Sequence, residues 1–242
     1  MGKGLVVLAA VLAFAAAAAH AGGATGTRAN AVSNAPNHKI SHSTSSNWSG
    51  YSAIKGTYTR VSASWTQPTA SCTSQTTYSS FWVGLDGYSS NTVEQTGTSA
   101  DCSGGRPSYY AWYEMYPKFP VNLSLAVRPG DSISASVTTS GDGRFTLTIT
   151  NNTSHATYQT TQTLKRARLA SAEVIAEAPS SSGGVLPLTN FGTANFSSAT
   201  VNGTAIGSWN PDKIDMVANG VTKATTSALS GGTSFSVAWK HS

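Results

Sequence analysis

The sequence is poor in charged side chains. Of its 242 residues, 10 are Asp or Glu and 15 are Lys or Arg, so that charged residues make up 10% of the chain, against roughly 25% in an average soluble domain. The formal charge of +5 reflects scarce acidic residues, since the Lys and Arg residues are scattered along the chain. The absence of a basic stripe with interleaved aromatic residues argues against nucleic-acid binding. A chain rich in Ser, Thr and Gly and poor in charge is typical of secreted β proteins.

Histidine is almost absent from the body of the chain. Four of the five histidines lie in the first 42 residues or next to the last residue, and only His155 lies within the expected folded part, in a polar loop. A Ser-His-Asp triad needs a supported imidazole, and a catalytic zinc needs about three protein ligands. One loop histidine supplies neither, so we expect His155 on the surface and no metal or cofactor. The Asp-Thr-Gly and Asp-Ser-Gly signatures of pepsin-like proteases are also absent, which leaves carboxylate chemistry without histidine.

Long apolar runs are confined to the N-terminus. Lys3 precedes an apolar run from Leu5 to Ala19, and Ala19 and Ala21 are small residues at the two positions that a signal peptidase reads. The run is too short and too rich in Ala to remain in a bilayer, where a spanning helix needs about 20 apolar residues. We therefore predict a signal peptide over residues 1–21 and a secreted, extracellular protein that has no membrane contact after its removal.

Residues 22–43 show no hydrophobic period and could not form a core. Two interpretations are open. The segment is either a disordered linker or a short prosegment whose positive charge, from Arg28, His38 and Lys39, lies over an active site until the segment is removed. Removal is expected to leave an N-terminus between residues 40 and 47. A single folded domain is expected over residues 44–242.

The chain has two cysteines, Cys72 and Cys102. In an exported protein a disulfide between them is expected. Closing that loop would stabilise the fold by roughly 3 to 4 kcal/mol if loop entropy dominates, and it would tether the segment that carries Trp82 and Gln95. Catalysis by a thiol is not expected.

Beyond residue 46 the dominant hydrophobic period is two. Apolar and small polar residues alternate over residues 61–65, 123–127, 133–137, 145–149 and 235–239. Each segment is typical of a half-buried strand. Turn residues at 128–131 and an Asp-Gly pair within 140–143 fit connections between antiparallel strands. The sequence therefore predicts an all-β fold, one antiparallel β-sandwich, over about 200 residues.

Residues 166–177 are ambiguous. The segment is rich in helix-forming residues, and Glu173 and Glu177 are four apart, so that propensity alone favours a helix. As a strand, the segment would place Glu173 on one face with Leu169 and Ile175. Composition leaves both alternatives open.

Six motifs occur in a particular order. They are Asn47-Trp-Ser-Gly50, Phe81-Trp-Val-Gly-Leu-Asp-Gly87, Glu94-Gln-Thr-Gly97, Tyr109-Tyr-Ala-Trp-Tyr-Glu-Met-Tyr-Pro117, Ser171-Ala-Glu-Val-Ile-Ala-Glu177 and Leu186-Pro-Leu-Thr-Asn-Phe-Gly192. In this order and at these spacings they resemble the glutamic peptidases, or eqolisins. The resemblance covers nearly everything after residue 46. Each tetrapeptide alone is a weak signal, whereas six in order are unlike a chance match.

The resemblance implies an exported acid endopeptidase with a concanavalin-like sandwich of two large antiparallel sheets and a catalytic Gln–Glu pair. Gln95 matches the family glutamine, and Glu173 matches the family glutamate, which makes residues 172–177 a strand. Positions that line or support the family cleft are matched by Trp48, Trp82, Asp86, Glu114 and Tyr116. Two departures are Val174, where the family has an aromatic residue, and Tyr110, where it has Asp, so the acidic support may differ from the family's.

The resemblance also implies polypeptide substrates, and we expect a monomer. Without it, Gln95 and Glu173 would be solvated strand residues, Asp86 a turn residue, and Glu114 and Glu177 surface charges. The alternative function is a carbohydrate-binding module or a glycosidase. A glycosidase could use Glu114 with Glu173, because it needs two carboxyl groups about 5 to 10 Å apart. Gln95 separates the alternatives, since a glycosidase has no need of that carboxamide.

Overall fold

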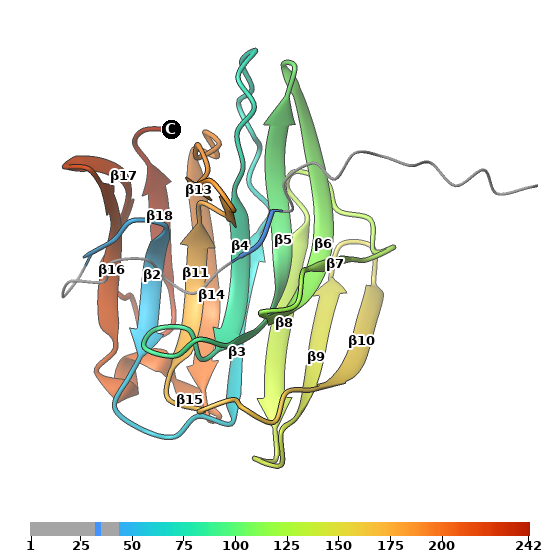
Figure 1. Cartoon of the computed structure of the whole chain (residues 1–242), viewed down its shortest axis with the longest axis vertical. Helices are drawn as coiled ribbons and strands as arrows, with labels where there is room; N and C mark the ends of the chain where they lie inside the picture. Colours follow the sequence, from blue (N-terminus) through green and yellow to red (C-terminus); the bar gives the residue numbers. More distant parts are fainter. Residues whose placement is uncertain (1–31, 35–43) are drawn as a thin grey trace, which may run out of the picture.

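Almost all of the regular secondary structure in the described part of the chain is β-strand (Figure 1). The structure, a computed structural model, describes residues 32–34 and 44–242. The expected signal peptide and most of the expected prosegment lie outside these residues. Within them no helix is long and apolar enough to cross a membrane.

The strands form two halves that pack face to face. In spatial order the first half contains β10 (Ala156–Thr163), β9 (Arg144–Asn151), β8 (Ser132–Thr139), β3 (Arg60–Thr66), β14 (Thr193–Val201), β18 (Phe235–Trp239), β17 (Val221–Thr226) and β16 (Asp212–Ala218). The second half contains β2 (Trp48–Ala53), β11 (Ala172–Glu177), β4 (Ser80–Leu85), β5 (Val93–Ser103), β6 (Arg106–Tyr116) and β7 (Val121–Asn122). This arrangement is the predicted antiparallel β-sandwich.

Four short strands and one turn of 3-10 helix complete the fold. The strands are β1 (Thr44–Ser45), β12 (Ser180–Ser181), β13 (Gly184–Val185) and β15 (Thr204–Ala205), and the helix is η1 (Ile206–Trp209). Strand β1 pairs in parallel with β16, β15 pairs with β14, and β12 and β13 form a separate hairpin.

Strand β16 connects the two halves. Its first part, Asp212–Ile214, pairs with β2, whereas Met216–Ala218 pairs with β17. The two sheets expected from the sequence are therefore joined by hydrogen bonds along one edge, and β16 belongs to both.

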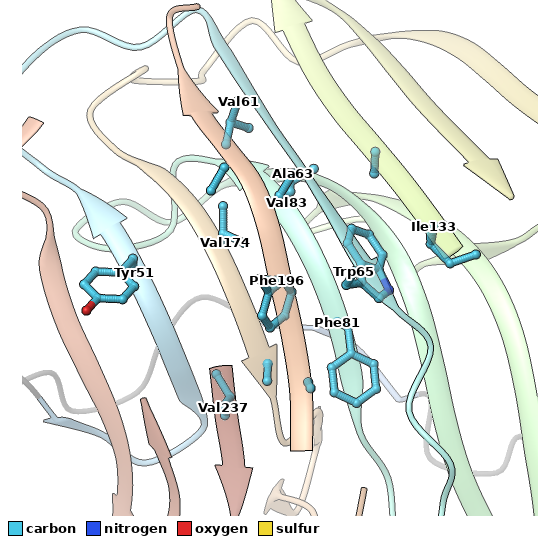
Figure 2. Packing of buried hydrophobic residues seen from close by; sticks show 14 of the residues in the cluster. Tyr51, Val61, Ala63, Trp65, Phe81, Val83, Ile133, Val174, Phe196 and Val237 are labelled. Atoms are coloured by element: carbon cyan, nitrogen blue, oxygen red, sulfur yellow. The ribbon is translucent and has the colours of Figure 1, made fainter. Parts of the chain in front are cut away.

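The main core fills the space between the two halves (Figure 2). In β3 the buried positions alternate, because Val61, Ala63 and Trp65 face inward and the residues between them do not. Phe81 and Val83 of β4 lie among the same buried side chains. The period of two that marks these strands in the sequence follows from this one-sided burial.

Three central strands of the second half are buried on both faces. Every residue of β2, β4 and β11 is buried. Their inward residues join the main core, whereas a second apolar cluster lies on the other face of the sheet. The second cluster contains Trp48, Trp82, Val93, Trp112, Ile175 and Ile214. This second face carries the polar residues that the sequence analysis selected.

Most of the local predictions are confirmed. Residues 172–177 form strand β11, and Cys72 and Cys102 form a disulfide with their Cα atoms 5.4 Å apart. His155 is exposed, as expected. The strand predicted over residues 123–127 is wrong: β7 ends at Asn122, and Leu125 and Val127 are buried without a partner strand. Prolines at 120 and 129 flank this segment, and proline cannot donate to a β-ladder.

Candidate active site

Adjacent strands place a row of polar side chains across the second face. Glu173 of β11 lies opposite Gly84 of β4, Gly84 opposite Gln95 of β5, and Gln95 opposite Glu114 of β6. On the other side, Ser52 of β2 lies opposite Glu173. Residues directly opposite one another in a sheet project from the same face. The sheet therefore brings Gln95, Glu173 and Glu114, all selected from the sequence, into one row.

Gly84 separates Glu173 from Gln95. Two strand spacings put the Cα atoms of these two residues roughly 10 Å apart, a gap that two long polar side chains can bridge. A Cβ atom on Gly84 would lie 2.9 Å from the Trp82 ring and 3.1 Å from the Gln95 Cβ atom. The glycine thus keeps the space between the two functional groups free of a third side chain.

The Glu173 carboxyl is fully buried. Its Oε1 atom accepts a hydrogen bond of 3.0 Å from the Ser52 hydroxyl, while its Oε2 atom has no hydrogen-bond partner among the described residues. Burial raises the pKa of Glu173 well above its ordinary value, more than the nearby Ser171 and Ser52 hydroxyls lower it.

The Gln95 carboxamide is held through its nitrogen. Its Nε2 atom donates to Glu114 Oε2 at 3.0 Å and to the Asn34 carbonyl at 2.6 Å. The Gln95 Oε1 atom is buried and, in the part of the chain that the structure describes, unpartnered. Gln95 Oε1 and Glu173 Oε2 are therefore two buried acceptors in one row with Gly84 between their residues. A water molecule could donate one hydrogen bond to each.

Residues 32–34 lie against this row. Ser33 exchanges two backbone hydrogen bonds of 2.8 Å with Ser180, and its hydroxyl donates to Glu114 Oε1 at 2.8 Å. The Asn34 N–H donates to Glu114 Oε2 at 3.1 Å. Part of the expected prosegment therefore contacts the candidate site, whereas its positively charged residues fall outside the described residues.

A cavity of about 350 Å³ adjoins the row. Its lining includes Val32, Asn34, Ser80, Ser99, Tyr110, Trp112, Phe119 and Asn122. A larger hollow of about 600 Å³ includes residues of β13 and of the loop after β16 in its lining, but none of the row. The smaller cavity is not lined by Glu173, Gln95 or Glu114 either, but it meets the row through Asn34, whose backbone bonds to Gln95 and Glu114. Within residues 32–34 and 44–242 there is no cluster of three metal-ligating side chains.

Tryptophan side chains pack on the same face of the sheet as the row of polar residues. Trp48 and Trp82 meet edge to face, with ring centroids 5.0 Å apart and an interplanar angle of 77°. Trp82 Nε1 donates to Glu177 Oε2 at 2.8 Å, and Asn47 Nδ2 donates to Glu177 Oε1 at 3.2 Å. Glu177 therefore fixes the N–H edge of the Trp82 ring in position. The expectation of a surface charge at Glu177 is wrong, because two side-chain N–H groups replace its water.

The Asp86 carboxyl binds the loop that leads into β11. Asp86 has a left-handed backbone (φ 67°), and its carboxyl accepts the N–H groups of Arg168, Leu169 and Ala170 at 2.7, 2.9 and 2.9 Å. All three donors precede β11, the strand that carries Glu173. Asp86 is fully buried. Its carboxyl therefore holds the segment that leads into β11.

Tyr116 and Tyr110 pack at the edge of the second cluster. Tyr116 is half-buried, lies opposite Val93 and packs against the second cluster. Tyr110, at the position where the family has Asp, donates a 2.7 Å hydrogen bond to Asp101 Oδ2. Burial raises the pKa of Asp101 to about 6. A Tyr–Asp pair therefore lies beside the second cluster.

The four glutamates of the chain are all buried. All of them, Glu94, Glu114, Glu173 and Glu177, are fully buried on β5, β6 and β11. Glu94 projects into the main core, because it alternates with Gln95 along β5 and lies opposite Leu85 and Met115. Sequence reasoning missed Glu94 and missed the burial of Glu114 and Glu177. One signal was available in the sequence: the chain has very few acidic residues, and all of its glutamates lie in the three segments that form β5, β6 and β11.

Because these carboxyls are buried, we expect the free energy of unfolding to fall as the pH rises. Burial raises the pKa from 4.5 to about 9 for Glu94 and to about 8 for Glu114. The native state therefore retains protons that the unfolded chain loses above about pH 4.5. Their contribution to stability is complete below pH 4.5 and is lost as the pH rises through 8 and 9, at up to roughly 1.4 kcal/mol per pH unit for each group.

Denaturant midpoints at pH 3, 5, 7 and 9 check this prediction. A matched variant is Glu94→Gln, which keeps the shape of the protonated carboxyl but cannot ionise, and it should flatten the fall between pH 5 and 9. A wild-type midpoint that rises from pH 5 to pH 8 would contradict the prediction.

Comparison with known proteins assigns the chain to a family. A family model described as the Peptidase A4 family matches residues 46–239. Aspergillopepsin-2 of Aspergillus niger is 28% identical over 209 residues, which cover 76% of this chain and 74% of that protein. Scytalidopepsin B of Scytalidium lignicola is 37% identical over 110 residues, covering 45% of this chain and 41% of that protein.

A solved structure supports the same assignment. The crystal structure of scytalido-glutamic peptidase with a transition state analog inhibitor superposes with a TM-score of 0.72 at 26% sequence identity. The match covers 81% of this chain and 98% of that chain. The residues matched by the family model, 46–239, include all the strands that build the row.

Proposed function

Because the chain belongs to the peptidase A4 family and is a glutamic-type endopeptidase, we propose that it hydrolyses peptide bonds through Glu173 and Gln95, at acidic pH and outside the cell. The observation that carries the proposal is the row itself. Glu173 and Gln95 flank Gly84, and each presents a buried oxygen atom without a partner among the described residues.

Peptide hydrolysis needs a base for the attacking water, a donor for the developing oxyanion and an acid for the leaving amine. A water between Glu173 Oε2 and Gln95 Oε1 would be held by both residues. Glu173, once ionised, takes the proton of that water and later returns it to the amine. Gln95 Nε2 donates to the oxyanion, a role supported by its 2.6 Å hydrogen bond to a peptide carbonyl. These steps use only this chain's own side chains.

The neighbouring residues support this chemistry by position. Glu114 accepts a hydrogen bond from Gln95 Nε2 and so holds the carboxamide nitrogen beside the Asn34 carbonyl. Ser52 holds the other oxygen of Glu173, and Asp86 fastens the chain that leads into β11. Trp48, Trp82 and Tyr116 pack in or against the second cluster, which excludes water from the floor of the site. A dry floor strengthens each of these hydrogen bonds.

The surrounding carboxyls favour activity at acidic pH. Glu114 and Glu177 have raised pKa values because they are buried, and both lie on the same face as Glu173. At acidic pH these two carboxyls are neutral, so they bury no charge beside Glu173. As the pH rises, their ionisation brings like charges together in a poorly solvated region, which disfavours the folded site.

Peptidase chemistry is favoured over the carbohydrate alternative. A glycosidase could use Glu114 and Glu173, but Gln95 lies between them in the row and would have no function in that reaction. Family membership supports the same choice. For export, the predicted signal peptide over residues 1–21 is the supporting feature.

Digestion of an unfolded protein tests the proposal. The full chain is incubated with a reduced, alkylated protein at each pH from 2 to 7, and the products are sequenced. We expect cleavage at peptide bonds with a maximum on the acidic side, insensitive to metal chelators. Failure to release peptides at any of these pH values would reject the proposed function.

A further inference from the structure

The row of polar side chains continues beyond Ser52. Asp212, the first residue of β16, lies opposite Ser52, which in turn lies opposite Glu173. Ile214, two residues further along β16, belongs to the second cluster. Because every second residue of a strand projects from the same face, the Asp212 carboxyl projects from the same face as Glu173 and Gln95. The sheet therefore places a further carboxyl at the β16 end of the row.

The Asp212 carboxyl is held at one oxygen and open at the other. The Tyr88 hydroxyl donates to Asp212 Oδ2 at 2.8 Å, and the Tyr88 ring packs against the second cluster. Burial, together with the contact with Asp212, raises the pKa of Tyr88, so this hydroxyl keeps the proton that it donates. Asp212 is only half-buried, and its Oδ1 atom has no hydrogen bond to any residue that the structure describes.

No cation of the described chain neutralises Asp212. The neighbouring Lys213 binds elsewhere, since its Nζ atom lies 3.9 Å from Asp215 and donates to the Thr226 carbonyl at 3.3 Å. The Lys213–Asp215 contact is the one ion pair within residues 32–34 and 44–242. A carboxylate with an open oxygen accepts N–H groups of an ammonium or guanidinium ion in charge-assisted hydrogen bonds. The group that fits Asp212 is therefore a cation that a substrate brings.

Asn34 shows in which direction a peptide backbone can lie along the row. Its N–H donates to Glu114 of β6 at 3.1 Å, and its carbonyl accepts from Gln95 of β5 at 2.6 Å. The backbone therefore passes from β6 toward β5 in the N-to-C direction. A substrate that binds in the same direction has its carboxyl side over β11, β2 and β16, and so toward Asp212.

The distance to Asp212 indicates where the cation would lie in the substrate. The water that we propose lies at Gly84, between Glu173 and Gln95. Asp212 lies three strands beyond Gly84, which is roughly 14 Å at about 4.8 Å per strand. An extended peptide rises roughly 3.4 Å per residue, so a side chain about three or four residues after the scissile bond can contact Asp212.

We propose that Asp212, held by Tyr88, is a specificity-determining residue that binds a lysine or arginine side chain about three or four residues to the carboxyl side of the scissile bond. The inference rests on the proposed function and names a preferred class of substrate for it. The contact is remote from the reacting atoms, so it forms equally in the bound substrate and in the transition state. It therefore acts on KM rather than on kcat.

Paired peptides test the inference. The peptides are otherwise identical and carry either Lys or Glu at the first, second, third or fourth residue after the cleaved bond, and kcat and KM are measured with the wild-type chain at acidic pH. We expect Lys to be preferred over Glu in kcat/KM by about tenfold at the third or fourth residue, as a partly exposed charge contact implies. Equal values for every pair would overturn the inference and leave the proposed function intact. Failure to cleave any of the peptides would overturn the proposed function, and the inference with it.

Three variants separate a local contact from the charge of the whole protein. Asp212→Asn can still accept the Tyr88 hydroxyl but carries no charge, and we expect it to lower the ratio of Lys to Glu toward one. Tyr88→Phe keeps the ring against the second cluster and loses the hydroxyl, so it should weaken the preference less. Asp142→Asn is the matched control, because it removes the same charge from a fully exposed turn between β8 and β9, and it should keep the wild-type ratio. An equal loss of preference in Asp142→Asn and Asp212→Asn would contradict the assignment of the subsite to Asp212.

Discussion

Replacing Glu173 with Gln is expected to lower turnover of an unfolded protein substrate by at least about 10²-fold, the lower end of general-base contributions. The carboxamide nearly keeps the size of the carboxyl and can still accept the Ser52 hydroxyl at one oxygen. It cannot take the proton of the attacking water. Since Glu173 is fully buried with a raised pKa, its protonated form and Gln are similar in charge, and we expect the melting temperature at acidic pH to change little.

The measurement is turnover at acidic pH together with the melting temperature of each variant. Glu94→Gln is the matched control, because Glu94 is a fully buried glutamate on β5 that projects into the opposite face of the sheet. It should retain most of the wild-type turnover. A folded Glu173→Gln protein that keeps more than a tenth of the wild-type turnover would show that the base lies elsewhere.

The contrast between these two glutamates illustrates what the sequence could and could not predict. The period of two predicted the strands, and the ordered motifs identified Gln95 and Glu173. The register that aligns them through Gly84 depends on the pairing of β4 with β5, which follows it in the chain, and with β11, which lies far from both in the sequence. No local pattern reports such pairing, because each strand satisfies its own alternation in several registers.

Residues 166–177 show tertiary context overriding propensity. Helix-forming residues dominate the segment, yet β11 lies between β2 and β4 and is buried at every position. A strand buried on both faces gains more from its two neighbours than the segment would gain from helical hydrogen bonds alone. The resemblance to a family resolved what composition left open.

Glu177 was misjudged for a different reason. An isolated glutamate on a strand is ordinarily solvated, because an unpaired buried charge is costly. Here the Trp82 and Asn47 N–H groups supply hydrogen bonds, and burial keeps the carboxyl neutral by raising its pKa. Such partners lie far from Glu177 in the sequence, so a single sequence does not reveal them.

The sequence did not predict the hydrogen bonds that hold residues 32–34, and the physical reason is similar. Binding there uses the backbone of Ser33 and Asn34 and a single serine hydroxyl. Backbone groups are the same in every residue, so composition carries no record of them. Hydrophobic patterning reports burial of side chains, and it is silent about a segment held by main-chain hydrogen bonds.

Replacing Gln95 with Ala is expected to lower turnover by roughly 10² to 10³-fold, the cost of losing one oxyanion donor in comparable sites. The change removes Nε2, which in the structure holds a peptide carbonyl at 2.6 Å, and Oε1, which we propose to hold the water. It leaves Glu173 and its hydrogen bond with Ser52 in place. The loss should therefore fall mainly on kcat, because the oxyanion forms only after substrate has bound.

Gln159→Ala is the matched control, since Gln159 is an exposed glutamine within strand β10 of the other half of the sandwich. Its kcat should equal that of wild type. Removing a buried side chain leaves a cavity, so Gln95→Ala should also melt at a lower temperature, and both proteins are assayed well below their melting temperatures. If folded Gln95→Ala kept a wild-type kcat and changed only KM, Gln95 would be a binding residue and the oxyanion donor would have to be another group of the row.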